Sequence, residues 1–176
     1  RFTLNTGGGE PQLYTGKHTS LDSTANGFYL DENGISIGSA IRMNATDGGS
    51  VLVGNLKSGN KYWTINGDTS KASITYGTRG SANSVSLRTD ELTIGSKFYV
   101  SASDGSMRLG NSAVDGNGKY WSISTTKSTT KEDESYIAYN TTSFGESSGI
   151  YIGTDGIRLS NKFSVDDSGS LMAKLG

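Results

Sequence analysis

Apolar and polar residues alternate along many short stretches of this chain. The runs Ile157-Arg158-Leu159 and Phe163-Ser164-Val165 each place an apolar side chain at every second position, which is the pattern of a β-strand with one buried face. No stretch of about 11 residues has the apolar spacing of an amphipathic helix. Pairs that favour tight turns lie between the alternating runs: Asn33-Gly34, Asn66-Gly67, Asp104-Gly105, Asn117-Gly118 and Asp155-Gly156. The pattern predicts an all-β fold of short antiparallel strands and hairpins.

The pattern also repeats at a much longer interval. Lys61-Tyr62-Trp63-Thr64-Ile65 recurs as Lys119-Tyr120-Trp121-Ser122-Ile123, and Arg1-Phe2-Thr3-Leu4 is a divergent third copy. Internal repeats of this kind indicate an array of similar structural units. We therefore expect three tandem units of about 58 residues, at residues 1–60, 61–118 and 119–176.

Apolar pairs with spacing two follow one another in the same order within each unit. Each pair marks one strand with one inward face. The matched sets are Phe28/Leu30, Val85/Leu87 and Ile150/Ile152; Ile35/Ile37, Leu92/Ile94 and Ile157/Leu159; Ile41/Met43, Phe98/Val100 and Phe163/Val165; and Val51/Val53, Met107/Leu109 and Leu171/Ala173. With the opening strand and a less regular strand near Leu13, Ile74 and Ile137, they predict about six strands per unit.

The core that these strands provide is thin. A domain of about 60 residues buries only about 60% of its unfolded surface, and roughly 11 inward apolar side chains per unit barely offset the ordering of the backbone. We therefore expect copies of the chain to complete one another's core in an elongated, intertwined homotrimer; the alternative is a monomer of β-sandwich-like units. The predicted core residues are Phe2, Trp63, Trp121, Ile65, Ile123, Phe98 and Phe163.

Composition and charge narrow the classes of function. The chain has 176 residues, with 25 glycines, 27 serines, 19 threonines, no cysteine and a formal net charge of -1. Because its 16 basic and 17 acidic residues are scattered, no surface for nucleic acid is expected. No apolar run approaches the ~18 residues that cross a bilayer, so no membrane insertion is expected. Without cysteine, disulfides and thiolate metal sites are excluded.

Aromatic residues at the start of the second and third units are candidates for saccharide contact. Trp63 and Trp121 recur in register with an aliphatic residue two positions later, which favours packing in the core over a sugar platform. By the same alternation, Tyr62 and Tyr120 point the other way. An exposed Tyr offers a stacking face and a hydroxyl to a saccharide, although an ordinary surface role is the alternative.

Loops that differ between the units supply the other candidates. His18, Arg79 and Phe144 lie in the second inter-strand loop of successive units, and each is a candidate saccharide contact. The alternatives are a surface loop position for His18 and packing under its own loop for Phe144. The first loop of the third unit is longer and charged, and is either a polar contact surface or a solvated loop; it carries Lys127, Lys131, Glu132, Asp133 and Glu134.

No motif for catalysis, a metal or a cofactor stands out. His18 is the only histidine and has no triad or metal-site pattern around it. Asp31, Asp90 and Asp155 occupy the same hairpin in successive units, which indicates turn formers and not a carboxylate pair for glycoside cleavage. Asp115-Gly-Asn-Gly lacks the spaced acidic ligands of a calcium loop. We expect no catalytic residues, no metal and no cofactor.

The third unit resembles a module of phage proteins. The stretch Ile150-Tyr-Ile-Gly-Thr-Asp-Gly-Ile, continued by Leu159-Ser-Asn-Lys-Phe-Ser-Val, a Gly turn and Leu171-Met-Ala, is similar to the repeat in tail-fibre, minor structural and receptor-binding proteins of phages that infect Gram-positive bacteria. Ser160 stands where the module usually has Gly, and Arg1-Phe2 where it has Tyr-Trp. The resemblance is clear in the third unit, fair in the second and weak in the first.

This resemblance implies a trimeric part of the phage tail that acts at the host cell surface. The leading hypothesis is an adhesion module that binds host cell-wall polysaccharide, with affinity gained from three copies. A purely structural stalk is the second hypothesis. A polysaccharide-degrading enzyme is the third, because phage hyaluronidases carry somewhat similar turns in a fibrous trimer. The loops differ in length and charge between the units, which favours recognition over a stalk. The enzyme hypothesis lacks support, because the sequence shows no cluster of catalytic residues.

Overall fold

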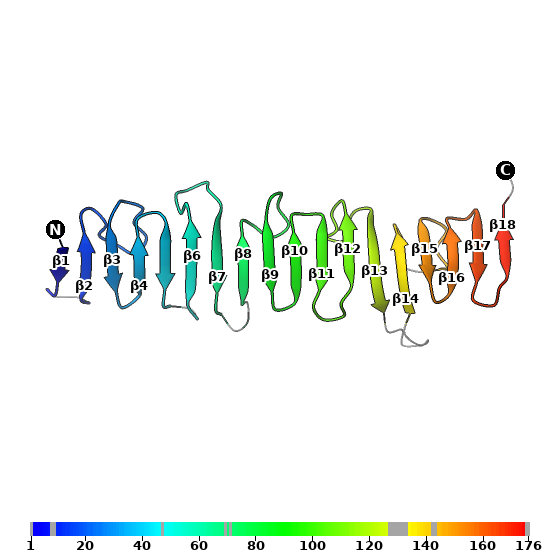
Figure 1. The fold of residues 1–176 in the computed structure, drawn as a ribbon, viewed down its shortest axis with the longest axis horizontal. Helices are drawn as coiled ribbons and strands as arrows, with labels where there is room; N and C mark the ends of the chain where they lie inside the picture. Colours follow the sequence, from blue (N-terminus) through cyan, green and yellow to red (C-terminus); the bar gives the residue numbers. More distant parts are fainter. Residues whose placement is uncertain are drawn as a thin grey trace. The chain divides into compact units, whose positions relative to one another are not determined.

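The computed structural model describes residues 2–7, 10–46, 48–68, 70, 72–126, 134–141 and 144–174. These residues form 18 β-strands and no helix (Figure 1). The all-β expectation is therefore confirmed. The chain divides into two compact units, of which the first comprises Arg1–Thr78 and Ser84–Thr89 and the second Arg79–Asn83 and Asp90–Gly176.

In the first unit, each strand pairs antiparallel with the next strand along the chain. The strands are β1 (Phe2–Asn5), β2 (Gln12–Thr15), β3 (Phe28–Asp31), β4 (Gly34–Ile37), β5 (Ile41–Asn44), β6 (Ser50–Gly54), β7 (Tyr62–Asn66), β8 (Ser73–Tyr76) and β9 (Val85–Arg88). Sequence neighbours are thus also spatial neighbours, as the predicted hairpins require.

The second unit is built in the same way. Its strands are β10 (Glu91–Ile94), β11 (Phe98–Ser101), β12 (Met107–Gly110), β13 (Tyr120–Thr126), β14 (Glu134–Tyr139), β15 (Ile150–Gly153), β16 (Gly156–Leu159), β17 (Phe163–Asp166) and β18 (Leu171–Ala173). Each unit is therefore an open antiparallel meander.

One face of the first unit carries two lines of apolar side chains, and we call it the apolar face. The strand registers join one residue from each strand into a continuous aliphatic row: Leu4, Leu13, Leu30, Ile35, Met43, Val51, Ile65, Ile74 and Leu87. Beside it runs a row that includes aromatic residues, the aromatic row: Phe28, Ile37, Ile41, Val53, Trp63, Tyr76 and Val85.

The apolar face of the second unit has the same two rows. Its aliphatic row is Leu92, Val100, Met107, Ile123, Ile137, Ile152, Ile157, Val165 and Leu171. Its aromatic row is Phe98, Leu109, Trp121, Tyr139, Ile150, Leu159 and Phe163. Every aliphatic position in both units is Leu, Ile, Val or Met.

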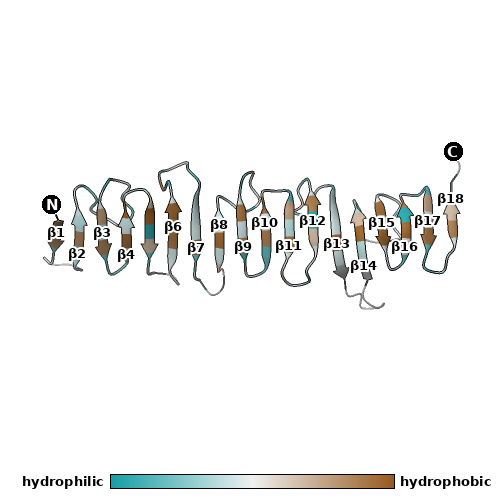
Figure 2. Cartoon of the chain, in the orientation of Figure 1, coloured by the Kyte–Doolittle hydropathy of each residue, from teal (hydrophilic) through white to brown (hydrophobic). Residues whose placement is uncertain are grey.

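Charged side chains within the strands lie on the other face, which we call the polar face. Because successive side chains of a strand point to opposite faces, the registers separate all the described charged strand residues from both apolar rows. They are Asp31, Arg42, Arg88, Glu91, Arg108, Arg158 and Asp166. The alternation of hydropathy within single strands is visible in β16 of Figure 2.

Burial within one chain is the reverse of that in an ordinary globular sheet. The polar face contains the buried side chains, including Tyr29, Ser36, Ser86, Thr93, Ser122, Tyr136, Ala138, Tyr151 and Arg158. The apolar face is open, and 20 large hydrophobic residues are exposed in the described chain, nearly all of them on this face. Loops cover the polar face and leave the apolar face uncovered.

The predicted core residues lie on this open face. Trp63 is 43% exposed, Trp121 42% and Phe2 73%, and Ile65 and Ile123 are also exposed. Phe98 and Phe163 are partly buried. Within one chain these residues therefore do not enclose a core. Their burial by further copies of the chain, which the sequence also predicts, stays a prediction.

Ser160 lies in a turn whose backbone conformation favours glycine, and the matching turns follow β4 and β10. Gly38 has φ 51° and Gly95 has φ 57°, and Ser160 adopts φ 52° at the matching position. This left-handed conformation favours glycine. Ser160 donates its backbone N–H to the carbonyl oxygen of Gly149 over 2.7 Å, so the turn keeps its geometry with a less suitable residue.

Candidate functional site

Two shallow polar grooves lie beside matched strands, one in each unit. Asn60, Lys61, Tyr62, Thr64, Gly77 and Thr78 line the first, which we call the Tyr62 groove. The second, the Tyr120 groove, lies between the β11–β12 turn and strands β12 to β14, and is lined by Asp104, Ser106, Arg108, Tyr120, Ser122 and Tyr136, among others. Each has a volume of about 190 Å³.

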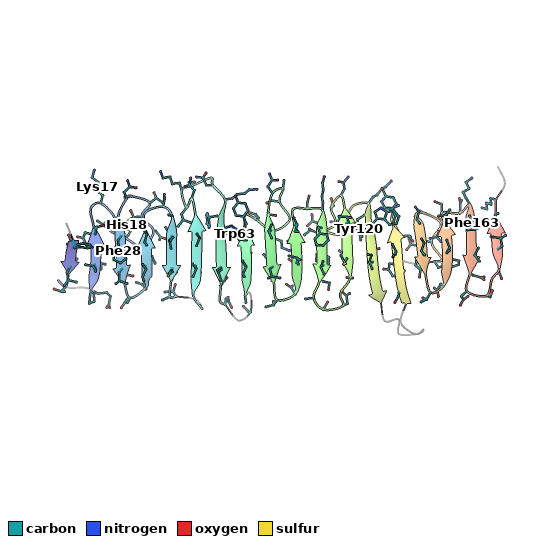
Figure 3. The ribbon with its side chains drawn as sticks, in the orientation of Figure 1. Lys17, His18, Phe28, Trp63, Tyr120 and Phe163 are labelled. Carbon is teal, nitrogen blue, oxygen red and sulfur yellow. The ribbon has the colours of Figure 1, made fainter. Side chains whose placement is uncertain are left out.

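Both grooves are built around the tyrosine that opens a strand. Tyr62 begins β7 and Tyr120 begins β13, and each is followed two residues later by a hydroxyl residue on the same face, Thr64 or Ser122. Both tyrosines are half-buried. Figure 3 labels Tyr120 and Trp63 on their strands. The structure thus brings two of the predicted saccharide contacts into grooves that offer an aromatic ring and hydroxyl groups.

A tyrosine and arginine cluster distinguishes the Tyr120 groove. The guanidinium carbon of Arg108 lies 5.0 Å from the ring centroid of Tyr99 and 5.5 Å from that of Tyr120, within the range of a cation–π contact. The register places Tyr99 and Ser122 on either side of Arg108 on the polar face. Neither Arg108 nor Tyr99 is among the saccharide contacts predicted from the sequence.

Asp104 supplies the negative charge of the same groove. It accepts the backbone N–H of Ser106 over 2.9 Å. This hydrogen bond, with those of the Ser101 and Ser106 side chains, lowers the pKa of the Asp104 carboxyl. Asp104 is therefore ionised at neutral pH and is held by the turn before β12.

The tryptophans pack against tyrosines on the apolar face. The Trp63 and Tyr76 ring centroids are 5.3 Å apart with an interplanar angle of 44°, and Trp121 and Tyr139 give 5.3 Å and 42°. In each pair, the tryptophan and the tyrosine are directly opposite each other on adjacent strands. A packing role predicts nearly the same geometry at both places, because residues that recur in each unit are those that the repeated fold requires.

His18 is buried, so the expectation of a surface loop histidine is wrong. Its side chain has 0% exposure. Nδ1 donates to the carbonyl oxygen of Ala25 over 2.7 Å, and Nε2 lies 2.6 Å from the hydroxyl oxygen of Ser36. The contact with Ser36 fastens the 16–27 loop to β4, and the bond to Ala25 lies within the loop; His18 is labelled in Figure 3. A ligand cannot reach this imidazole in the folded conformation, which removes His18 from the candidate contacts.

Arg79 is engaged in an ion pair with Glu91. The guanidinium binds both carboxylate oxygens of Glu91 through Nε and Nη2. Glu91 is 6% exposed and Arg79 32%. The contact with Glu91 raises the pKa of Arg79. The geometry gives Arg79 a structural partner and explains why the segment Arg79–Asn83 belongs to the second unit.

Phe144 packs against the polar face. Its ring lies edge-on to Tyr151, with the centroids 5.9 Å apart, and Tyr151 stacks on Tyr136 at 5.4 Å. Together with Ala138 these rings form a buried hydrophobic cluster. Of the two alternatives that the sequence left open, the structure shows the packed one.

Some charged candidate residues lie outside the residues that the structure describes, and Asp31 forms a turn. Lys127, Lys131, Glu132 and Asp133 lie outside the described residues, and for Glu134 only the backbone of β14 is described. Asp31 accepts the backbone N–H groups of Asn33 and Gly34, which confirms its role in the turn. In the described ranges, no group of three or more His, Cys, Asp or Glu side chains could hold a metal ion.

A signal for Arg108 was present in the sequence. Arg108 lies between Met107 and Leu109, and the matched positions in the other units hold Leu52 and Met172. A charged residue at a position that is otherwise apolar departs from the requirements of the repeat. Such departures mark recognition better than repeated residues do, because the fold alone does not demand them.

Membrane-spanning helices are absent from the part of the chain that the structure describes. Comparison of the chain with protein-family models, curated proteins and solved structures finds no match.

Proposed function

We propose that this chain is an adhesion segment of a phage tail fibre, in which three copies assemble through their apolar faces and contact host cell-wall saccharide through their polar faces. The observation that carries the proposal is the open apolar face. It consists of two rows of uncharged, mainly apolar side chains in each unit, and no described charged strand residue lies on it.

The surface area supports association. The chain has an accessible surface of 11034 Å², whereas a monomeric protein of 18.5 kDa is expected to expose about 8,200 Å². The excess of about 2,800 Å² per chain is comparable with the area that obligate oligomers bury. Exposed apolar patches of this extent mark interaction surfaces.

A further copy of this chain is the occupant that fits the apolar face best. The face is uncharged along every described strand, so an equally uncharged surface is required to avoid burying unpaired charge. The apolar face of another copy meets this requirement row by row. The number three rests on the resemblance of residues 150–174 to the trimeric phage module.

Saccharide contact is assigned to the Tyr62 and Tyr120 grooves. They lie on the polar face, so assembly through the apolar face leaves them open. A half-buried Tyr ring with neighbouring hydroxyl groups provides a stacking surface and hydrogen bonds for a pyranose. Shallow sites bind weakly one at a time, and three copies compensate by multivalency.

The test has two measurements. Sedimentation should give a mass close to three times 18.5 kDa, and the trimer should bind purified cell walls of a host bacterium. Tyr62→Ala and Tyr120→Ala should each weaken wall binding without changing the mass. Tyr14→Ala is the matched control, because Tyr14 lies on the same face of the first unit and lines neither groove.

Each possible result identifies which of the hypotheses is wrong or right. A mass near 18.5 kDa contradicts the assembly. A trimer that binds no walls indicates a structural stalk. Release of new reducing ends from hyaluronan or wall polysaccharide would indicate a polysaccharide-degrading enzyme, and we expect none.

A further inference from the structure

We infer that the Tyr120 groove selects a saccharide that carries an anionic group, and that Arg108 is the residue that determines this specificity. The inference rests on the proposed function and adds the chemical class of its ligand. The anionic group is a carboxylate or a phosphate, because a guanidinium recognises both with the same planar set of N–H donors.

The guanidinium of Arg108 is held in place by its neighbours. Tyr99 and Tyr120 hold its guanidinium by their ring faces, which leaves the in-plane N–H groups to other partners. The backbone at Gly116 bounds it on a further side, since a Cβ built there would lie 3.0 Å from Nη1. A guanidinium restrained in this way loses less conformational freedom when it binds a ligand.

The charge of Arg108 is not balanced by an ion pair in the described chain. No carboxylate among the described residues forms an ion pair with it. Asp104 is the charged group that shares the groove, and its carboxylate is occupied by hydrogen bonds within its own turn. A partly buried cation with no paired carboxylate in the described chain is suited to an anionic partner.

The contrast between the two grooves also supports the inference. The lining of the Tyr62 groove includes no arginine; its cation is Lys61, and the Tyr62 ring has no cation–π partner in the described residues. Both grooves offer Tyr and a hydroxyl residue, and they differ in the kind of cation. The Lys61 ammonium is a point charge, whereas the Arg108 guanidinium offers a planar set of N–H donors that can bind two oxygens of one carboxylate or phosphate.

The experiment compares three probes of similar length on the trimer: a glucuronate-containing oligosaccharide, a poly(glycerol phosphate) chain and a neutral dextran oligosaccharide. Calorimetric titration should show tighter binding of at least one anionic probe than of dextran, and this preference should fall as salt is raised. Which of the two binds identifies the carboxylate or the phosphate as the source of the charge.

Substitution of Arg108 gives the decisive comparison. Arg108→Met, which introduces the residue of the third unit, should weaken anionic binding about tenfold, as the loss of a charge-assisted hydrogen bond predicts. Arg108→Lys keeps the charge but not the planar donors and should restore part of the binding. Dextran binding should fall by a smaller factor than anionic binding in both variants, and circular dichroism should report an unaltered fold.

Two results would overturn the inference. One is equal affinity of the native trimer for dextran and for both anionic probes, and the other is unchanged anionic binding by Arg108→Met. In either case, dextran or wall binding that still depends on Tyr62 and Tyr120 would leave the proposed function intact. Failure of the native trimer to bind walls and all three probes would reject both proposals.

Discussion

Adjacent residues of one strand have opposite roles in this protein. Tyr120 and Trp121 begin β13, and alternation places the phenol on the polar face and the indole on the apolar face. Trp121 is 42% exposed in one chain, so its ring is available to a neighbouring copy. The role of each aromatic residue therefore follows from its parity in the strand and not from its type.

Replacement of Trp121 by alanine should destabilise the assembled protein by about 3–5 kcal/mol, the range for emptying a buried aromatic site. Tyr120→Ala is the control and should leave the melting temperature nearly unchanged, because its ring lies at the edge of a groove. Thermal melts of both variants check this. A Trp121→Ala protein that keeps its melting temperature but loses saccharide binding would show that the indole does not pack against another copy.

Replacement of Ser160 by glycine should stabilise the folded protein. Its φ of 52° is the left-handed conformation that Gly38 and Gly95 adopt in the matching turns. Ser160→Gly removes the Cβ strain and loses only a weak side-chain contact with Gly149, so the free energy of unfolding should rise by about 0.5–1 kcal/mol. Gly95→Ser is the reverse control and should lower it, and denaturant titration measures both. A decrease for Ser160→Gly would contradict the strain argument.

At the scale of the elements, loops supply the cover that the polar face needs. The 16–27 loop is tied to β4 through His18, and Phe144 brings its loop onto Tyr151. Arg79 ties a third loop to Glu91 on β10. Each loop uses a different side chain for the same purpose, which explains why the loops diverge while the strands recur.

Breaking the Arg79 contact tests this role and has a defined pH dependence. Arg79→Met removes the guanidinium that pairs with buried Glu91, and should cost about 1–3 kcal/mol at neutral pH because Arg79 is itself partly exposed. The deficit should shrink as the pH falls, because protonation of the Glu91 carboxyl removes the negative charge with which the guanidinium pairs. Melting curves between neutral and acid pH check the trend. A deficit that grows toward acid would show that the Arg79–Glu91 ion pair is not the interaction lost.

At the scale of the whole molecule, two faces with opposite character divide the work. In the proposed assembly the apolar face associates with other copies, and the polar face, fastened by loops, carries the grooves. The strand registers keep these functions apart along every described strand. The proposed assembly therefore requires no rearrangement of the chain, since the surface to be covered is already continuous in each unit.

Cysteine substitution tests this arrangement directly, because the native chain has no cysteine. In the proposed trimer the aliphatic rows of different copies face one another, so Ile65→Cys should form crosslinked chains with a short bifunctional thiol reagent. Thr64→Cys, on the polar face of the same strand, should not. Denaturing electrophoresis separates the two outcomes. Equal crosslinking of both variants would argue against association through the apolar face.

Local patterns in the sequence were sufficient to predict the strands. Alternation over two residues and tight-turn pairs predict all 18 strands approximately, because a meander uses only contacts between neighbours in the chain. The same alternation places Tyr62 opposite to Trp63. The positions of His18 and Arg108 could not be predicted in this way, since each depends on a partner brought by a loop or a neighbouring strand.

Alternation along the sequence predicts the all-β class and the separation of two faces, because strand geometry turns a period of two into opposite surfaces. The strand register and the choice of the face that is covered within one chain come from the folded structure. The loops fold over the polar face, where buried polar groups need hydrogen-bond partners, and His18 reaches Ser36 in this way. The apolar rows have little need of such partners and remain open in one chain, and their burial by further copies stays a prediction.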